Sequence, residues 1–305
     1  MRIGIMLGAT PDPDASIDKF IATAKDMEAR GFSSLWLAHI RGHDALMAMA
    51  MAARETTHLE VGTAVTPIQP RHPMALAQQA LTAQAMARGR FTLGVGLSHK
   101  RVIEDMLGLS YAQPANTMRE YLDVLMPLLN GEEVRYEGEK YRVQIGLDIA
   151  DASTPVPTLV AALGPQMLKV AGSRSDGTVL WMTGPTTISQ HIVPNIQKAA
   201  TEASRSAPRI VAGFPVVLTN DEAGARETIA KQLQVYGQLP SYRAMLDREG
   251  VNGPGELALV GGENALAQQL TRVAQAGATD LVAVALETDP GSQARTLDFL
   301  QSRLP

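Results

Sequence analysis

The feature that most constrains the fold is a repeated alternation between short apolar runs and segments with helical spacing. The runs have the length and composition of strands buried on both faces, as in parallel sheets. Most segments between them repeat apolar residues on one helix face, and this alternation favours a parallel sheet covered by helices. The eight runs are at residues 3–7, 34–38, 59–65, 91–96, 158–162, 177–182, 209–218 and 280–286.

Eight strand and helix units predict one (β/α)₈ barrel, a TIM barrel, as a single domain over residues 1–305. A doubly wound open sheet is the alternative, and it is disfavoured because Gly4 and Gly8 lack the Rossmann glycine spacing. Insertions are predicted near 131–157 and 239–260. The first contains a hairpin turn at 136–140. In the second, residues 241–259 are rich in Gly and Pro, which predicts an irregular lid or substrate loop.

The helical segments follow the same periodicity. Thr219 and Glu222 have the spacing of a capping box at the start of one of them. The helix at 45–53 is apolar almost all round and therefore needs cover on its outer side. This predicts a homodimer, with cover by the carboxyl-terminal helix as the alternative. The predicted helices are 17–30, 45–53, 74–87, 115–129, 166–173, 186–203, 221–238, 263–276 and 292–304.

Composition excludes several classes of function. A net charge of −4 gives no basic field for a phosphate backbone, so no nucleic acid partner is expected. The chain has no cysteine, which removes disulfides, thiol catalysis and cysteine-ligated metal. The apolar run at the amino terminus is too short for a signal peptide or a membrane span. We therefore expect a soluble cytoplasmic protein that acts on a small molecule without a membrane partner.

Catalytic groups of a barrel come from the carboxyl ends of its strands. Two of the six histidines, His39 and His99, fall at such ends. No metal site is predicted, because the HExxH pattern and paired carboxylates are absent and His39 with His43 lacks a third ligand. No Gly-x-Ser-x-Gly elbow for a serine nucleophile occurs either. The other strand-end candidates are Gly8, Ala64, Val65, Gly96, Leu97, Ser98, Leu163, Gly164, Pro165, Thr183 and Gly184.

Two short patterns at strand ends carry more specific expectations. Gly94 and Gly96 lie two apart in the fourth run, so they face one side of a strand and let a flat ligand approach the backbone; an ordinary strand followed by a surface histidine is the alternative. Gly164-Pro165 and Gly184-Pro185 each precede a predicted helix, where free amides bind phosphate. Plain tight turns are the alternative for both.

A series of short motifs extends over nearly the whole chain. They are Arg71-His72-Pro73 with Ala77 and Ala80, Gly89-Arg90-Phe91, Leu93-Gly94-Val95-Gly96, Arg119-Glu120-Tyr121-Leu122 with Leu125 and Leu128-Leu129, Tyr136-Glu137-Gly138, Ala162-Leu163-Gly164-Pro165, Ala171-Gly172 and Asp176-Gly177. In their order and spacing the chain resembles the luciferase-like monooxygenase superfamily, and within it the oxidoreductases that use the deazaflavin coenzyme F420.

The resemblance implies a barrel that holds a flavin or deazaflavin ring at the carboxyl ends of its strands. It implies that Ala64 and Val65, where the family often has a cis non-proline peptide, back the ring. It further implies that His39 lies by the reactive carbon and that His99 replaces a glutamate proton donor. Ala38 stands where many members have an acidic residue, which leaves the tautomer of His39 open. Gly96, Leu97 and Ser98 would lie beside the ring, and Leu163, Gly164, Pro165, Thr183 and Gly184 near its phosphate and tail.

The expected reaction is hydride transfer between coenzyme F420 and an unidentified small organic substrate. A deazaflavin gives up only hydride, so the protein must also supply a proton, for which His99 or His39 is the candidate. An FMN-dependent monooxygenase with a partner reductase is one alternative, and a non-catalytic cofactor-binding protein is another. Residues 100–114 and 241–259 are expected to shape the substrate side, and Arg101 and Arg243 are exposed-arginine candidates for an anion.

Overall fold

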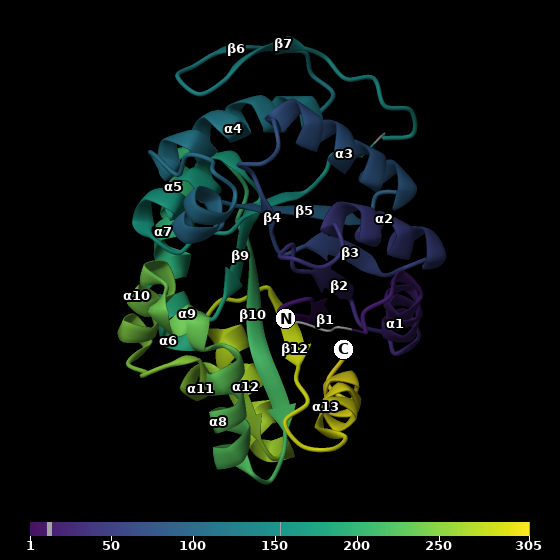
Figure 1. Cartoon of the computed structure of the whole chain (residues 1–305), viewed down its shortest axis with the longest axis vertical. Helices are drawn as coiled ribbons and strands as arrows, with labels where there is room; N and C mark the ends of the chain where they lie inside the picture. The colour runs from purple at the N-terminus through teal and green to yellow at the C-terminus, as the bar shows by residue number, and fades with distance from the viewer. Residues whose placement is uncertain (11–13, 153, 305) are drawn as a thin grey trace.

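The computed structural model describes residues 1–10, 14–152 and 154–304 and shows a closed barrel of eight parallel strands (Figure 1). Neighbours pair in chain order, and the last strand pairs with the first, so the sheet has no gap. The predicted TIM barrel is therefore confirmed, and the open doubly wound sheet is excluded. The eight barrel strands are β1 (Arg2–Leu7), β2 (Ser34–Leu37), β3 (Glu60–Thr63), β5 (Phe91–Gly96), β8 (Thr158–Val160), β9 (Gly177–Trp181), β10 (Arg209–Leu218) and β12 (Asp280–Ala285).

Helices surround the strands, and their ends carry recognisable local signals. Ser16 caps the first helix through the amide of Lys19, and Asp44 caps the second through the amide of Met47. Several others begin with proline in the first turn, where its missing N–H costs nothing. The helices are α1 (Ile17–Ala29), α2 (Ala45–Glu55), α3 (Pro73–Met86), α4 (Pro114–Leu129), α5 (Pro165–Arg174), α7 (Val193–Glu202), α8 (Glu222–Gln232), α12 (Glu263–Gln275) and α13 (Ser292–Gln301).

The prediction of an irregular loop at 241–259 is wrong, because the segment is mainly helical. It contains α10 (Pro240–Glu249) and α11 (Pro254–Leu257), and α9 (Gln234–Gln238) precedes it. Pro240 occupies the first turn of α10, and Gly250 ends that helix in the left-handed conformation with φ of 80°. The proline and the glycine thus bound a helix instead of interrupting one. A short strand that the sequence did not reveal, β11 (Leu259–Gly261), then pairs with β10.

Three other segments differ from expectation in detail. The predicted helix at 221–238 is divided into α8 and α9, and its cap is Asp221, which accepts from the amide of Gly224, instead of Thr219. Residues 186–203 are helical but include the π-helical stretch η2 (Ile188–Ile192) between α6 (Pro185–Thr187) and α7. The loop at 100–114 includes a second π-helical stretch, η1 (Arg101–Met106), and a two-residue strand, β4 (Thr66–Pro67), pairs with β5.

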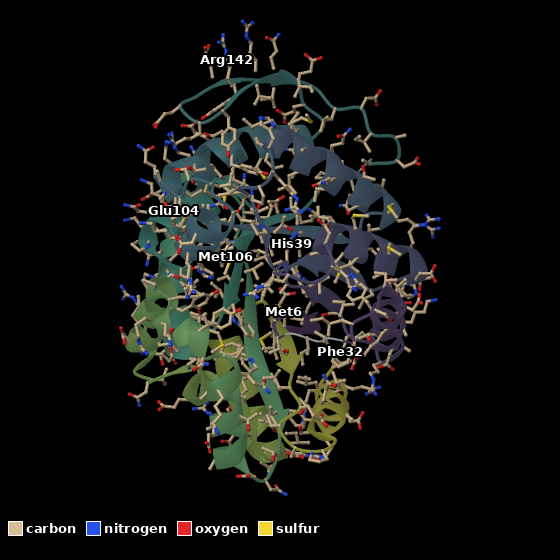
Figure 2. All side chains as sticks on the ribbon, in the orientation of Figure 1. Met6, Phe32, His39, Glu104, Met106 and Arg142 are labelled. Atoms are coloured by element: carbon tan, nitrogen blue, oxygen red, sulfur yellow. The ribbon has the colours of Figure 1, made fainter. Side chains whose placement is uncertain are left out.

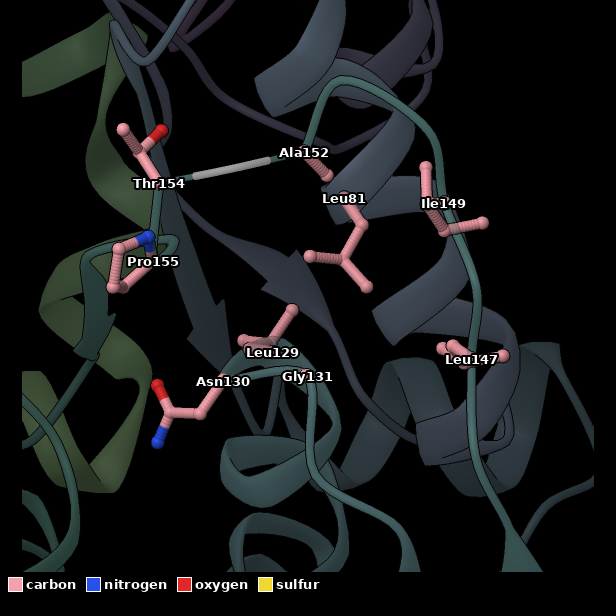
Figure 3. Close-up of a pocket in the computed structure, with 9 residues that line it drawn as sticks. All are labelled: Leu81, Leu129, Asn130, Gly131, Leu147, Ile149, Ala152, Thr154 and Pro155. Atoms are coloured by element: carbon pink, nitrogen blue, oxygen red, sulfur yellow. The ribbon is translucent and has the colours of Figure 1, made fainter.

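The insertion at 131–157 carries the predicted hairpin. Its strands, β6 (Val134–Glu137) and β7 (Arg142–Ile145), pair antiparallel and lie beyond α4 at the edge of the molecule (Figure 1). A cavity of about 140 Å³ lies beneath the segment that returns from this hairpin (Figure 3). It is at the amino-terminal end of the barrel, far from the strand ends that carry the site candidates. Its lining is Leu81, Leu129, Asn130, Gly131, Leu147, Ile149, Ala152, Thr154 and Pro155.

The apolar helix α2 is covered mainly within the chain. It packs between α1 and α3, whereas the carboxyl-terminal helix α13 packs against β10 and β12. The expected alternative, cover by the carboxyl-terminal helix, is therefore wrong. The exposed apolar side chains of α2 are Met47, which is 69% exposed, and Met51, which is 38% exposed. The apolar surface that α2 leaves in solvent is narrower than its sequence indicates.

Charged side chains close the amino-terminal end of the barrel. Arg209, at the start of β10, donates to both Asp280 (2.8 Å) and Glu60 (2.6 Å), and Arg2 also contacts both carboxylates. Burial raises the pKa of Asp280, but the hydrogen bonds and charge of Arg209 outweigh this effect and leave the pKa below its ordinary value of 3.8. The side chain is only 2% exposed, so removing its charge would leave buried arginine charge uncompensated.

We predict that Asp280→Asn lowers the free energy of unfolding by about 3 kcal/mol. The measurement is urea unfolding followed by circular dichroism. The pKa of Asp280 is lowered in the folded protein. Its contribution to the free energy of unfolding is therefore complete above pH 3.8, the ordinary pKa, and is lost as the pH falls through the folded pKa. The difference in free energy of unfolding between wild type and Asp280→Asn should be the same at pH 7 and pH 5 and should shrink only in stronger acid.

The matched control is Glu55→Gln, which removes one partner of the exposed Lys25–Glu55 ion pair. Both side chains of that pair are about half exposed, so its loss should change the free energy of unfolding far less than Asp280→Asn does. Equal effects from the two substitutions would contradict the role given to the buried network.

Candidate active site

The carboxyl ends of the strands form a rim on which most predicted site residues meet. Side chains within the strands are largely buried, whereas those at this rim are partly exposed, including His39, Val65, His99 and Trp181. Figure 2 shows His39 in the central part of the molecule, while Arg142 of the hairpin points outward at its edge. Gly8 ends β1 with φ of 76°, and a Cβ there would lie 3.2 Å from the carbonyl oxygen of Ala38. The first two strand ends therefore lie in close contact.

The segment after β3 takes an unusual path beside β5. A cis peptide bond joins Ala64 and Val65, as the family resemblance implies. A Cβ at Gly94 would lie 2.0 Å from the carbonyl oxygen of Thr63, and one at Gly96 would lie 2.5 Å from the Val65 side chain. These two glycines thus accommodate the end of the neighbouring strand. The expectation that their missing side chains leave room for a flat ligand is wrong.

A side-chain hydroxyl fixes this approach. Thr63 donates from Oγ1 to the carbonyl of Gly94 (2.8 Å) and accepts from the amide of Gly94 (2.9 Å). Two buried acceptors nearby, Thr66 Oγ1 and Gln69 Oε1, have no hydrogen-bond partner among the described residues, although Gln69 Nε2 donates to the carbonyl of Leu97. Buried polar atoms usually have partners. A ring with N–H groups on its edge, laid near Val65, offers the kind of donor that these atoms lack.

His39 is held by the start of α2. Its Nδ1 accepts from the amide of Ala45 (3.3 Å), the first residue of that helix. The guanidinium of Arg71, which can only donate, faces the other ring nitrogen, and a neutral imidazole can accept from only one of these two donors. Arg71 Nη2 lies 3.3 Å from Nε2, and Asp44 Oδ2 lies 3.9 Å from it. Asp44 directs that oxygen to Arg71 at 2.7 Å. The carboxylate missing at Ala38 is thus replaced by one that acts on His39 through an arginine.

Both histidines are neutral at pH 7. Burial lowers the pKa of His39, the positive charge of Arg71 lowers it further, and Asp44 opposes them only in part. For His99, burial alone lowers the pKa. The ordinary histidine value is 6.5, so each imidazole is ready to accept a proton at neutral pH. At pH 7 His99 is therefore better suited to accept a proton than to be the proton donor that the family resemblance implies.

The two glycine-proline turns differ in what their amides contact. At α5, Gly164 is the cap residue and makes no side-chain hydrogen bond to the helix. At α6, Glu249 of α10 accepts from the amides of Thr186 (3.1 Å) and Thr187 (2.7 Å) and from the Thr187 hydroxyl (2.8 Å). The amides after Gly184, which the sequence suggested as a phosphate site, are therefore already bonded to the carboxylate of Glu249. At the amino end of α5, with Leu163, Gly164 and Pro165, no side chain of the described residues caps the helix in this way.

Sequence reasoning assigned no role to several residues that the structure places at the rim. Arg71 and Asp44 contact His39, Tyr111 donates to the carbonyl of Ser98 (3.3 Å), and Tyr242 lies against His99. Only Arg71 stood in a quoted motif. Arg243, considered for an anion, instead donates to Asp247 and to the carbonyls of Val251 and Asn252, so it stabilises the end of α10.

Residues 1–283 match the family model described as luciferase-like monooxygenase. The chain belongs to this family. Among its relatives, a 5,10-methylenetetrahydromethanopterin reductase of Methanolobus tindarius is 27% identical over 252 residues, covering 82% of this chain and 76% of the reductase. A putative coenzyme F420-dependent oxidoreductase of Mycobacterium tuberculosis is also 27% identical, over 77% of this chain and 72% of its own length.

Solved structures confirm the luciferase-like fold. An F420-dependent secondary alcohol dehydrogenase, determined with an F420–acetone adduct, superimposes with a TM-score of 0.83 at 18% identity, over 100% of this chain and 98% of the dehydrogenase. The oxygenating constituent of 3,6-diketocamphane monooxygenase from Pseudomonas putida was determined with FMN. It superimposes with a TM-score of 0.78 at 17% identity, over 100% of this chain and 98% of the monooxygenase chain. Proteins that share this fold thus include one determined with an F420 adduct and one determined with FMN.

Two further observations bear on alternatives. Among the described residues, no group of three or more His, Asp or Glu side chains is arranged to hold a metal ion. Within the same ranges, none of the helices is long and apolar enough to cross a bilayer.

The charges around His39 predict that two substitutions shift its pKa in opposite directions. Arg71→Met should raise the pKa of His39, because it removes the nearby positive charge, and Asp44→Asn should lower it further. Asparagine also caps helices well, so Asp44→Asn leaves the start of α2 intact. The measurement is an NMR titration of the histidine ring carbons. Arg54→Met, at the exposed end of α2, is the control, and shifts of the same sign in both test variants would refute the arrangement.

Proposed function

We propose that this protein transfers a hydride between coenzyme F420 and a small organic substrate. The observation that carries the proposal is His39, a titratable ring held at a strand end with Nδ1 on a helix amide and Nε2 beside Arg71. Family membership supports it, as do the relatives whose names specify F420. Deazaflavins carry hydride, so the remaining task for the protein is to position the substrate and handle one proton.

The rim offers a place for each part of such a cofactor. In this proposal Ala64 and Val65 back the ring, with Gly8 behind the rim, and Gly96, Leu97 and Ser98 lie beside it. The phosphate and tail reach Leu163, Gly164 and Pro165 at the amino end of α5. Thr183 and Gly184 line the same side, but the amides that follow them bond to Glu249.

His39 or His99 moves the proton. When an alcohol-like substrate loses its hydride, the neutral imidazole takes the hydroxyl proton, so that no alkoxide has to form in a partly buried site. In the reverse direction the imidazolium returns the proton to the carbonyl oxygen. The lowered pKa values of both histidines favour the base role at pH 7. Arg71 holds His39 in place through its own ion pair with Asp44.

An FMN-dependent monooxygenase is the second candidate, because an FMN enzyme shares the fold over the whole chain. The two reactions differ in cofactor and in oxygen use. FMN chemistry of this kind consumes molecular oxygen and needs an external reductase, whereas deazaflavin hydride transfer needs neither. A protein that only carries the cofactor would bind it and transfer no hydride.

The deciding experiment is a cofactor titration followed by turnover. We expect saturable binding of F420, measured by its fluorescence, and weaker binding of FMN. With reduced F420 and a panel of ketones that begins with acetone, His39→Ala or His99→Ala should lower turnover by about 10²-fold or more while F420 still binds. His72→Ala, on α3's cap, is the control. Full turnover in both variants, or oxygen consumption with FMN, would overturn the proposal.

We also propose that two copies associate through α2. Its exposed methionines, Met47 and Met51, lie one helical turn apart and give an apolar strip on the solvent side of the helix. Light scattering at micromolar concentration should show a dimer, and Met47→Lys with Met51→Lys should convert it to a monomer. Val235→Lys, a half-exposed apolar residue of α9, should leave the mass unchanged. A monomeric wild-type protein would rule out this association.

A further inference from the structure

A row of four rings crosses the rim from the end of β5 to the end of β9. His99 lies 5.7 Å from Tyr242 of α10, Tyr242 lies 5.0 Å from Tyr236 of α9, and Tyr236 lies 6.1 Å from Trp181, all between ring centroids. The last two pairs are edge to face, an arrangement that aromatic pairs prefer. We call these residues the aromatic row. It joins two strand ends that are separated only by β8, and it does so through α9 and α10.

The aromatic row is free of charge. Burial raises the pKa of both tyrosines and lowers that of His99, so all four rings are neutral at pH 7. No aspartate, glutamate, lysine or arginine perturbs any of these three pKa values, in contrast to His39. Each of the four residues is nevertheless partly exposed. A ligand that touches the aromatic row therefore meets uncharged rings.

Glu249 positions the aromatic row. Its carboxylate binds the amides of Thr186 and Thr187, so the far end of α10 is attached to the turn that follows β9. A Cβ at Gly184 would lie 2.1 Å from the carboxyl carbon of Glu249, which shows how closely this turn and α10 approach. The attachment holds Tyr242 over the rim. Glu249 is thus a positioning residue, because it acts through the helix that carries the ring.

We propose that the aromatic row is the substrate-facing wall of the site and that it selects a flat, uncharged organic molecule such as an aryl ketone or aryl alcohol. The inference rests on the proposed function, since it names the substrate class of the same site. Flat apolar molecules gain from contact with ring faces and edges. A carboxylate bound there would lose its hydration, and none of the four neutral rings carries a positive charge to replace it. His99 lies at one end of the row, where a carbonyl or hydroxyl oxygen would meet its imidazole.

Tryptophan fluorescence tests the proposal without any cofactor. The chain has two tryptophans, and Trp36 is fully buried among the strands, with Nε1 donating to Ser34 and its ring packed against Arg209. Saturable quenching by a ligand therefore reports on Trp181, and Trp181→Phe should abolish the signal. Three probes separate shape from charge: acetophenone is flat and neutral, cyclohexyl methyl ketone is neutral but not flat, and benzoate is flat but charged.

We expect saturable quenching by acetophenone, weaker binding of the cyclohexyl ketone and no saturation with benzoate. Tyr242→Leu should lower the affinity for acetophenone about tenfold, and Tyr242→Phe, which keeps the ring, should bind acetophenone like wild type. Glu249→Gln should also lower this affinity, because it loosens α10. Tyr136→Leu, on the distant hairpin, should have no effect. Equal binding of all three probes, or unchanged binding in Tyr242→Leu, would overturn the proposal.

The two proposals fail in different experiments. Loss of F420 binding would remove the proposed reaction while the probe measurements remained valid for the aromatic row. Normal F420-dependent turnover of ketones, together with acetophenone binding that is insensitive to Tyr242 and Tyr236, would remove the aromatic row as the wall and leave the reaction in place.

Discussion

Closure of the parallel sheet is the constraint on which the rest of this molecule depends. Because β12 pairs with β1 and all the barrel strands are parallel, the carboxyl ends of all eight strands meet on one rim. His39 and His99 are far apart in sequence, and the parallel direction of the strands places both at one end of the protein. The opposite end is sealed by the Arg209, Asp280 and Glu60 network, so stability and chemistry are located at different ends of the same barrel.

The barrel was predictable because its signal is local and repeated. Each buried strand reads as an apolar run, and each helix shows its own periodicity, so the alternation is visible without any knowledge of contacts. The histidines were identified for the same reason, since a residue directly after a strand has only one end of the barrel to occupy. The cis peptide at Ala64–Val65 followed from family resemblance, not from the residues themselves.

What the sequence did not reveal depends on contacts between distant segments. The contact of Arg71 with His39 joins residues 32 apart, and Glu249 reaches Thr187 across 62 residues. Gly94 and Gly96 were interpreted as space for a ligand, but the sequence cannot say that Thr63 and Val65 fill that space. At α10, proline and glycine were interpreted as signs of a loop, although at the two ends of a segment they are equally typical of a helix.

The surroundings of the two histidines divide the rim into a polar half and an apolar half. His39 lies with Arg71 and Asp44, where a charged or strongly polar group is stabilised, and His99 lies at the end of the aromatic row, where it is not. The amino end of α6 belongs to the apolar half, because its amides are used to hold α10 through Glu249. An anionic tail that reached this side would have to displace that carboxylate and move Tyr242 with it. The amino end of α5 imposes no such cost. In the function proposed above, this difference orients a phosphate-bearing cofactor toward Gly164 and leaves the aromatic row to the substrate.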